Sequence, residues 1–287
     1  MKTPIILDFD RSVSPLPGVR SIPLGEWQER LRYGCSLREL NELAPLLEGA
    51  GIGLPPLTFL GSGDFHHLSY LLIKRLAAYG PFQVIVFDNH PDAMRYPWGI
   101  HCGSWVHHVC RLPFITRVTV VGITSQDIGG GHLWENDLRS LYSGKLFYIA
   151  LSPVTRLARL IGLSAIQEFK DDPSRLSSFI EGDLLKRDPH PVYLSIDKDV
   201  LSPSAVRTNW DQGILREEDL LEAVRVIKPR LIAGDVTGEI SFHLYQKWWK
   251  RLLSRWDGQS ASPPGDLDRL QQIQQAFNRK LLDLFAR

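Results

Sequence analysis

Runs of apolar residues alternate along the chain with amphipathic segments, and this alternation predicts its secondary structure. Short apolar runs rich in β-branched residues, each closed by glycine, proline or a carboxylate, are typical of strands buried on both faces. Segments whose apolar positions lie three and four residues apart predict amphipathic helices. The expected strands are residues 5–9, 55–60, 84–88, 117–121, 146–150, 192–197 and 231–235. The expected helices are residues 36–47, 66–79, 103–110, 174–186, 216–227, 239–256 and 266–285.

Strands that alternate with helices over the whole chain predict an α/β fold. We expect a three-layer α/β/α sandwich with a mostly parallel central sheet. A closed barrel is the competing architecture, and the irregular spacing of the helices disfavours it. We expect residues 1–287 to form a single domain, because the C-terminal linker and helix, residues 258–287, come too late in the chain to form another.

Polar residues directly follow two of the expected strands, and a histidine follows a glycine-rich turn. The carboxyl ends of parallel strands meet at one edge of a sheet, where open α/β sheets bind their ligands. Four carboxylates gathered there would repel one another, and two divalent cations would remove that penalty. A mixture of carboxylates and imidazoles suits Mn²⁺ better than it suits a metal bound by thiolates. The residues are Asp88, His90 and Asp92 after one strand, Asp197 and Asp199 after the other, and His66 after the turn.

Four short motifs, in this order along the chain, resemble motifs of the arginase and ureohydrolase superfamily, which includes agmatinase and formimidoylglutamase. They are His66-His67-Leu68-Ser69-Tyr70, Asp88-Asn89-His90-Pro91-Asp92, Gly99-Ile100-His101-Cys102-Gly103 and Ser195-Ile196-Asp197-Lys198-Asp199. The resemblance spans residues 57–240 and implies an arginase-like fold for this chain.

The resemblance also implies a cofactor, two Mn²⁺ ions per chain, and a reaction. The reaction would be hydrolysis of a C–N bond in a guanidino, amidino or related small molecule by a hydroxide that bridges the two ions. Asp92 would pass a proton to the leaving nitrogen. His101 would carry protons between the site and solvent, because imidazole titrates near neutral pH. The implied ligands are Asp88 and Asp197 on both ions, His66 and Asp92 on one ion, and His90 and Asp199 on the other.

The chain departs from the family pattern where a substrate would bind. Residues 207–213 replace the family's glycine- and threonine-rich substrate loop. The asparagine that holds the amino-acid end of the substrate in arginases has no counterpart, because Ala93-Met94 follow the aspartate motif. The family glutamate that pairs with the guanidinium would fall near Gly238, one residue before a glutamate of this chain. We therefore expect the metal chemistry to be retained and arginine specificity to be lost. The substrate-binding candidates are Glu239, Asn209 and Trp210.

Two other interpretations stay open. The chain could be an arginase-fold protein that keeps its metal ligands but acts as a binding or regulatory protein, as the altered loop at 207–213 and Met94 suggest. It could also be a deacetylase-like amidohydrolase that uses a single metal, for which the tandem His66-His67 is a weak indication.

Composition changes this picture little. Apolar residues make up 44% of the chain and charged residues 23%, which is ordinary for a globular protein. A net charge of +1 gives no electrostatic reason to expect a nucleic-acid or membrane partner. Three cysteines without a C-x-x-C pair, and the lack of a signal peptide or a long apolar run, predict a reduced, cytoplasmic compartment.

The expected partner is a small-molecule substrate, and the late helices are compatible with a homo-oligomer. We expect the aromatic group Trp248, Trp249 and Trp256 to pack in a core or a subunit contact.

Overall fold

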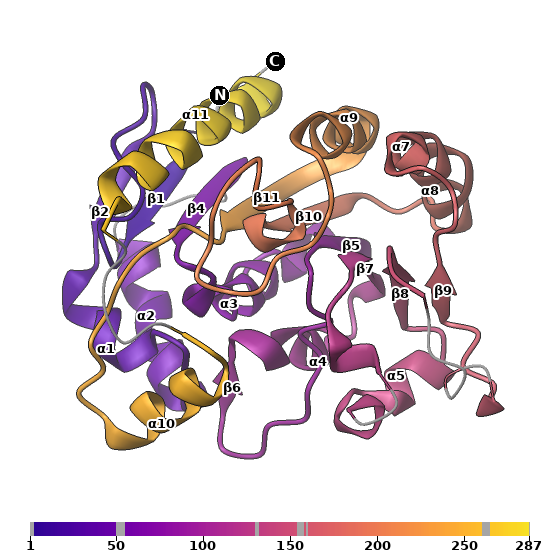
Figure 1. Ribbon diagram of the computed structural model, residues 1–287, viewed down its shortest axis with the longest axis horizontal. Helices are drawn as coiled ribbons and strands as arrows, with labels where there is room; N and C mark the ends of the chain where they lie inside the picture. Colours follow the sequence, from indigo (N-terminus) through magenta and orange to yellow (C-terminus); the bar gives the residue numbers. More distant parts are fainter. Residues whose placement is uncertain are drawn as a thin grey trace.

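The computed structural model describes residues 3–49, 55–129, 132–153, 158, 160–259 and 265–286. Within these residues a nine-stranded sheet runs through the molecule, and each pair of neighbouring strands in it is parallel (Figure 1). In spatial order the strands are β2 (Arg20–Pro23), β1 (Ile5–Asp8), β4 (Leu57–Gly61), β11 (Leu231–Thr237), β10 (Val192–Asp197), β5 (Phe82–Phe87), β7 (Ile115–Ile123), β8 (Leu146–Ala150) and β9 (Ile166–Glu168). A short antiparallel pair, β3 (Gly34–Cys35) and β6 (Ile100–His101), lies outside this sheet.

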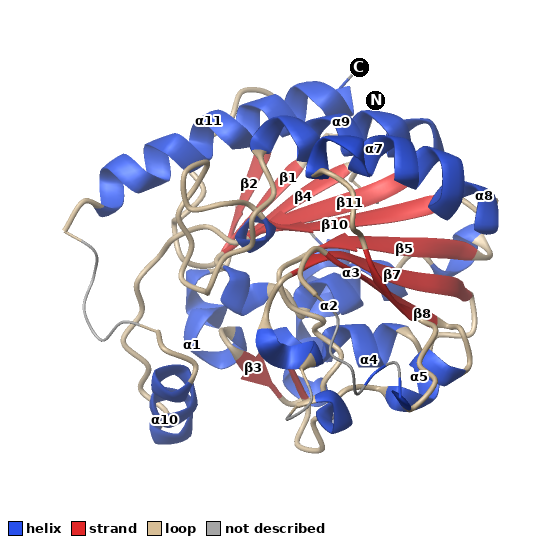
Figure 2. Cartoon of the chain, turned by 45° about the vertical axis from the view of Figure 1, so that its right-hand side comes forward, coloured by secondary structure: helices blue, strands red, loops and turns tan. Residues whose placement is uncertain are grey.

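Helices cover both faces of the large sheet, which makes the three layers visible in Figures 1 and 2. One face carries α7 (Leu176–Phe179), α8 (Leu185–Arg187), α9 (Glu217–Ile227) and α11 (Leu267–Ala286). The other face carries α1 (Gln28–Leu31), α2 (Leu37–Gly49), α3 (Leu68–Lys74), α4 (Trp105–Val109) and α5 (Leu138–Tyr142). Helix α10 (Trp248–Trp256) lies beside α1, away from the sheet. The α/β/α fold expected from the sequence is confirmed, and the sheet is parallel throughout the described strands.

The side-chain alternation of the central strands explains why they are apolar on both faces. In β5, Val84 and Val86 belong to the core that includes residues of α2 to α5. Ile85 and Phe87, which point the other way, belong to the core that includes residues of α9 and α11. Because each strand must fill two cores, its sequence reads as a continuous apolar run instead of an alternating one.

The seven strands expected from the sequence are all present, but the edge strands and the short antiparallel pair of β3 and β6 were not predicted. Strand β2 is largely exposed and reads Arg20-Ser21-Ile22-Pro23, so it carries no apolar run. Strand β9 has three residues, and β3 and β6 have two each. Strands this short give no periodic signal.

Three expected helices differ in extent. The segment expected to be helical over 239–256 is helical only in α10, and residues 239–247 form a loop whose Ser241 is held by Asn209. The segments at 66–79 and 174–186 are divided by 3₁₀ or π turns into shorter helices. Residues 260–264 of the expected linker lie outside the described residues. Among the helices described, none combines the length and the apolar character that crossing a bilayer requires.

Candidate metal centre and active-site cavity

The neighbouring strands β5 and β10 bring the predicted ligands together. Their register places Phe87 opposite Ile196, so the residues that follow each strand end side by side. His66 arrives from the turn after β4, which lies one strand beyond β11 in the same sheet. The carboxyl edge of the sheet therefore gathers side chains from three segments that are far apart in sequence.

The first group of ligand atoms surrounds Nδ1 of His66, which is buried. This nitrogen lies 3.0 Å from Oδ2 of Asp92, 3.2 Å from Oδ2 of Asp88 and 3.4 Å from Oδ2 of Asp197. His66, Asp88 and Asp197 can each offer one atom to a common ion.

The second group surrounds Nδ1 of His90 and shares Asp88 with the first. The nitrogen lies 2.9 Å from Oδ2 of Asp199 and 3.6 Å from Oδ1 of Asp88. The other ring nitrogen, Nε2, lies 2.7 Å from Oδ1 of Asp211, which fixes the orientation of the imidazole. The structure therefore contains two possible ion sites that meet at one carboxylate.

Backbone N–H groups hold three of these carboxylates in position. One oxygen of Asp88 accepts from the N–H of His90 at 2.7 Å, and one oxygen of Asp197 accepts from the N–H of Asp199 at 3.0 Å. One oxygen of Asp199 accepts from the N–H of Asn89 at 3.0 Å. In each case the second oxygen is directed toward a histidine, which prepares the carboxylate to bind a cation.

A chain of hydrogen bonds behind His66 defines its tautomer. Its Nε2 lies 2.9 Å from Oγ of Ser195, and that hydroxyl donates to Oδ1 of Asp235 at 2.7 Å. The hydroxyl proton is thereby used, so Nε2 of His66 must be the donor in the first bond. Nδ1 is therefore the atom that faces the three carboxylates. Burial lowers the pKa of His66, but Asp88 and Asp92 raise it well above its usual value, so a bound cation would take the place of the Nδ1 proton. Trp105 packs its ring against His66 at 4.7 Å and donates its N–H to Oδ2 of Asp92 at 2.8 Å.

The electrostatics of this arrangement fit bound cations. Nδ1 of His66 and Oδ2 of Asp88 are buried and have no hydrogen-bond partner among the described residues. Burial and the negative charge of Asp88 raise the pKa of Asp92 to about 7, and burial raises the pKa of Asp197 to about 6. Burial and Asp197 also raise the pKa of Asp199. A divalent cation would supply partners for the bare atoms and return these carboxyls to their charged forms.

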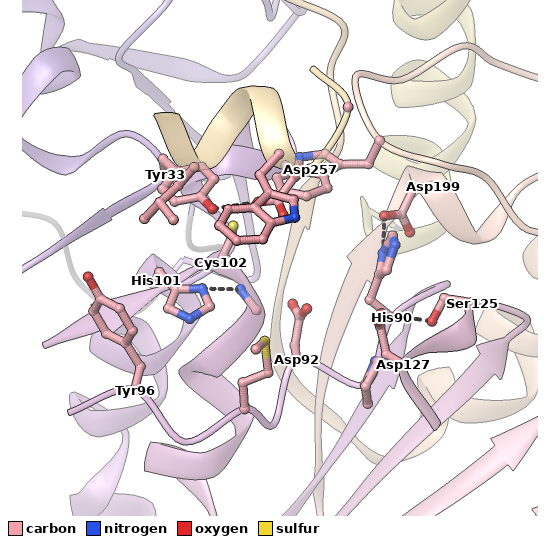
Figure 3. Close-up of a pocket in the computed structure, with 18 of the residues that line it drawn as sticks. Tyr33, His90, Asp92, Tyr96, His101, Cys102, Ser125, Asp127, Asp199 and Asp257 are labelled. Atoms are coloured by element: carbon pink, nitrogen blue, oxygen red, sulfur yellow. Dashed lines mark hydrogen bonds and ion pairs between the residues drawn. The ribbon is translucent and has the colours of Figure 1, made fainter. Parts of the chain in front are cut away.

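The ligands lie at the bottom of a cavity of about 1350 Å³. Figure 3 shows His90 and Asp199 on one side of it, Tyr33, Tyr96 and His101 on the other, and Asp92 between them. Helix α10 and the loop after it supply a further wall, with Trp249, Leu253 and Asp257 among the lining residues.

This chain is similar to a Thermotoga maritima protein described as an uncharacterized protein, with 34% identity over 212 residues that cover 74% of this chain and 68% of the relative. The two chains belong to one family. No model of a protein family matches the sequence.

Solved structures with a similar fold are arginase-like enzymes. Bacillus caldovelox arginase matches with a TM-score of 0.58 and 13% identity, covering 100% of this chain and 99% of that one. Bacillus subtilis formimidoylglutamase matches with a TM-score of 0.57 and 16% identity, covering 99% and 87%. Trypanosoma cruzi formiminoglutamase, solved with Mn²⁺, matches with a TM-score of 0.56 and 12% identity, covering 99% and 94%. The chain therefore has the arginase fold.

His101 lines the cavity, but its surroundings differ from those expected of a proton carrier. Its Nδ1 accepts a hydrogen bond from the N–H of Gly103 at 3.0 Å, and the edge of Tyr96 lies against its ring. Burial and the nearby His108 lower the pKa of His101 to about 4. The near-neutral pKa assumed from the sequence is therefore wrong for this environment, and at pH 7 the imidazole is neutral with its proton on Nε2.

Two of the three substrate-binding candidates do not line the cavity. Glu239 is buried, forms an ion pair with Lys198 and accepts from the side-chain amide of Asn278 at 2.6 Å. Asn209 exchanges two hydrogen bonds with the backbone of Ser241, at 2.6 and 2.8 Å. Both side chains are therefore occupied by structural contacts. Trp210, in contrast, lines the cavity and stacks near Tyr33.

Gly238 explains why this part of the family pattern has no direct counterpart here. Its φ of +88° lies in the left-handed region, and a Cβ at this position would come within 2.4 Å of Oδ1 of Asp197. No side chain fits there without displacing a ligand, and the glutamate one residue later points to Lys198.

Sequence reasoning missed three contributors to the site. Trp105 donates a hydrogen bond to Asp92, and Asp235 accepts one from Ser195, which contacts His66. Asp211 contacts His90 from an exposed loop. No sequence motif indicates that these residues contact the candidate ligands. The aromatic residues of α10 were expected in a core or subunit contact. Trp249 packs against the cluster of Tyr33, Cys102 and Tyr245, whereas Trp248 and Trp256 are 70% and 81% exposed and line the cavity, and the subunit contact stays a prediction.

Proposed function

We propose that this chain is a Mn²⁺-dependent hydrolase with two ions per chain, and that it cleaves a C–N bond of a guanidino, amidino or related small molecule. The observation that carries the proposal is that two groups of ligand atoms meet at Asp88. A shared carboxylate is what a two-ion site requires, because it screens the repulsion between two cations about 3.5–4 Å apart. The neighbours of known reaction, which include proclavaminate amidino hydrolase of Streptomyces clavuligerus, support this class of reaction.

In this proposal the six predicted ligands hold the ions. His66 and Asp92 would bind one ion, His90 and Asp199 the other, and Asp88 and Asp197 both. When bound, two Mn²⁺ ions would lower the pKa of water and so supply a nucleophile at neutral pH.

Asp92 is placed to hold and move a proton. It lines the cavity, and the indole N–H of Trp105 fixes its Oδ2 at 2.8 Å. Its backbone has a φ of +47°, a left-handed conformation that non-glycine residues seldom adopt and that is often found at functional sites. The Asp92 carboxyl can accept a proton from the attacking water and return it to the leaving nitrogen.

In this proposal His101 does not act as a base. The neutral imidazole presents its Nε2–H because Nδ1 is engaged by Gly103. It can therefore donate a hydrogen bond to the substrate through Nε2–H, whereas carrying a proton through Nδ1 would first require the Gly103 N–H to leave that atom.

The two alternatives gain less from the structure. His67, which suggested a single-metal amidohydrolase, is buried with its Nε2 3.8 Å from the sulfur of Cys35 and does not face the carboxylates. A purely regulatory protein would not need Asp92 in a strained backbone conformation beside a large open cavity.

The test is metal analysis followed by a reaction screen. The protein is purified with Mn²⁺, and its metal content is measured after removal of free metal; the proposal expects about two ions per chain. Release of urea or ammonia is then followed with arginine, agmatine, 4-guanidinobutyrate, formimidoylglutamate and aryl or alkyl guanidines. His101→Ala should keep both ions and lower the rate, whereas two bound ions with no turnover of any C–N substrate would favour the regulatory alternative.

A further inference from the structure

Helix α10 presents a broad apolar surface to the cavity. Five of its nine residues line the cavity, namely Trp248, Trp249, Leu252, Leu253 and Trp256. Trp249 and Leu253 pack against Tyr33 and Tyr245 at the base of the helix. The outer residues keep much of their surface exposed, 70% for Trp248 and 81% for Trp256, so this face has no partner among the described residues.

The helix is held in this position by a buried cation and by contacts at both ends. Lys250 is fully buried, and its ammonium donates to three backbone carbonyl oxygens, those of Glu29 (2.7 Å), Arg30 (3.1 Å) and Arg32 (2.7 Å). Before the helix, the N–H groups of residues 246 and 247 donate to the side chain of Glu29. After it, the hydroxyl of Tyr33 donates to Asp257 at 2.5 Å. These contacts hold the apolar face of α10 in place as one wall of the cavity, the α10 wall.

Aromatic residues outside α10 also line the cavity. Tyr96 and Trp98 contact each other edge to face at 5.5 Å, and Trp98 is 77% exposed. Met94 and Trp210 continue this lining toward the ligands. At about 1350 Å³ the cavity exceeds the 300–1,000 Å³ that is usual for small-ligand pockets, so guanidine itself would fill a small part of it.

The charges in the cavity disfavour an acidic substrate. None of the described residues that line it is lysine or arginine. Beyond the metal ligands, the charged lining residues are the carboxylates Glu39, Asp127, Asp211 and Asp257. Away from the candidate metal ligands, a substrate carboxylate would meet no lysine or arginine and would be repelled by these four carboxylates. A guanidinium or amidinium group is attracted by both the carboxylates and the aromatic faces.

We propose that the α10 wall binds an apolar substituent, and that the substrate is an N-substituted guanidine or amidine that carries an aryl or long alkyl group and no carboxylate. This inference rests on the proposed function for the reaction and extends it to the substrate class. Hydrolysis of benzylguanidine, for example, would consume one water, break the bond between the guanidinium carbon and the substituted nitrogen, and release benzylamine and urea.

Binding is measured by calorimetry on the full chain in the presence of Mn²⁺, with benzylguanidine, guanidine and 4-guanidinobutyrate as probes. We expect benzylguanidine to bind at least tenfold more tightly than either of the others. The double variant Trp248→Ala/Trp256→Ala should lose at least fivefold of the benzylguanidine affinity, and its exposed positions tolerate alanine. Trp134→Ala is the matched control, since Trp134 is 62% exposed and is not a lining residue, and its affinity should not change.

A gain-of-function variant separates this reasoning from simple damage to the fold. Leu252 is 55% exposed, and Leu252→Lys places a cation in the apolar wall. The preference for benzylguanidine over 4-guanidinobutyrate should then shrink at least fivefold. The inference is overturned if 4-guanidinobutyrate binds the unmodified protein as tightly as benzylguanidine, or if the double variant binds benzylguanidine unchanged.

Turnover distinguishes failure of this inference from failure of the proposed function. Hydrolysis of several guanidines without preference for the apolar ones would overturn the substrate class and leave the proposed function standing. Selective, α10-dependent binding of benzylguanidine without hydrolysis of any guanidine or amidine would support the apolar site and count against the hydrolase.

Discussion

Among the described residues, Asp88 belongs to both groups of ligand atoms, and this distinguishes its removal from that of a residue that would hold one ion alone. Asp199 belongs only to the group around His90. We therefore expect Asp88→Asn to abolish both sites, whereas Asp199→Asn should abolish one and leave the ion at His66. Both changes keep the size of the side chain and remove a negative charge.

The size of the effect follows from linkage. An ion present at 100 times its dissociation constant stabilises the folded state by about 2.7 kcal/mol, so two ions contribute about 5 kcal/mol. An unfolding entropy of about 2.1 cal/mol/K per residue gives this chain of 287 residues about 0.6 kcal/mol/K, so each kcal/mol raises Tm by about 1.7 °C. Saturating Mn²⁺ should therefore raise the Tm of the unmodified protein by about 8–9 °C. It should raise the Tm of Asp199→Asn by about half as much and leave the Tm of Asp88→Asn nearly unchanged.

The assay pairs thermal unfolding, with and without Mn²⁺, with metal analysis of each variant after gel filtration. Asp127→Asn is the matched control, because Asp127 lines the same cavity and lies outside both ligand groups. It should bind two ions and show the full shift. If Asp88→Asn retained an ion, or if Asp88→Asn and Asp199→Asn gave equal shifts, the shared-carboxylate arrangement would be refuted.

Three further predictions follow from contacts around the ligands. Ser195→Ala removes the hydroxyl that orients His66. We expect this variant to weaken Mn²⁺ binding about 10–100-fold, as measured by competition with a chelating dye. Circular dichroism should show that the fold is retained. Lys250→Met leaves three carbonyl oxygens without their donor, and we expect faster proteolysis within α10 and a loss of about 2–4 kcal/mol in unfolding free energy. Because the pKa of Asp92 is raised to about 7 and that of Asp197 to about 6 in the metal-free protein, an ion must displace their protons. Apparent Mn²⁺ affinity should therefore rise about tenfold per displaced proton per pH unit between pH 5 and 7. Calorimetry in two buffers of different ionisation enthalpy should detect the released protons. An affinity that does not change with pH would contradict this prediction.

The central strands could be predicted from the sequence because each has to fill two cores. Strand β10 was predicted with its exact ends, Val192–Asp197, because its apolar residues are continuous and stop at a carboxylate. The edge strand β2 has no such requirement, since one side of it faces solvent and its residues are largely exposed. Helix α10 was extended too far at its start because residues 239–247 contain enough apolar positions to imitate helical spacing.

The gathering of the candidate ligands at one edge of the sheet could be predicted for a related reason. Asp88 and Asp197 end neighbouring parallel strands, and the geometry of the sheet alone brings them together. Glu239 also follows a central strand, but the left-handed backbone at Gly238 turns it toward Lys198. Nothing in the local pattern indicates that turn. The apolar wall was missed because its position depends on Lys250, whose partners lie more than 200 residues earlier.

The buried pair of Arg32 and Asp64 ties the ligands to the walls of the cavity. Arg32 donates to Asp64 at 2.7 Å, and the Asp64 carboxylate also accepts from Trp210 at 3.2 Å, Tyr245 at 3.0 Å and Gln259 at 2.5 Å. A buried ion pair is costly unless further hydrogen bonds satisfy both charges. Ser62 and Ser241 accept from Arg32, and the further donors to Asp64 are Trp210, which lines the cavity, and residues close to α10. Asp64 lies in the same turn as His66, two residues earlier. The charge that anchors the walls therefore also fixes the turn that carries the candidate ligand His66, so a change in the shape of the cavity in this protein has to preserve that pair or move His66 with it.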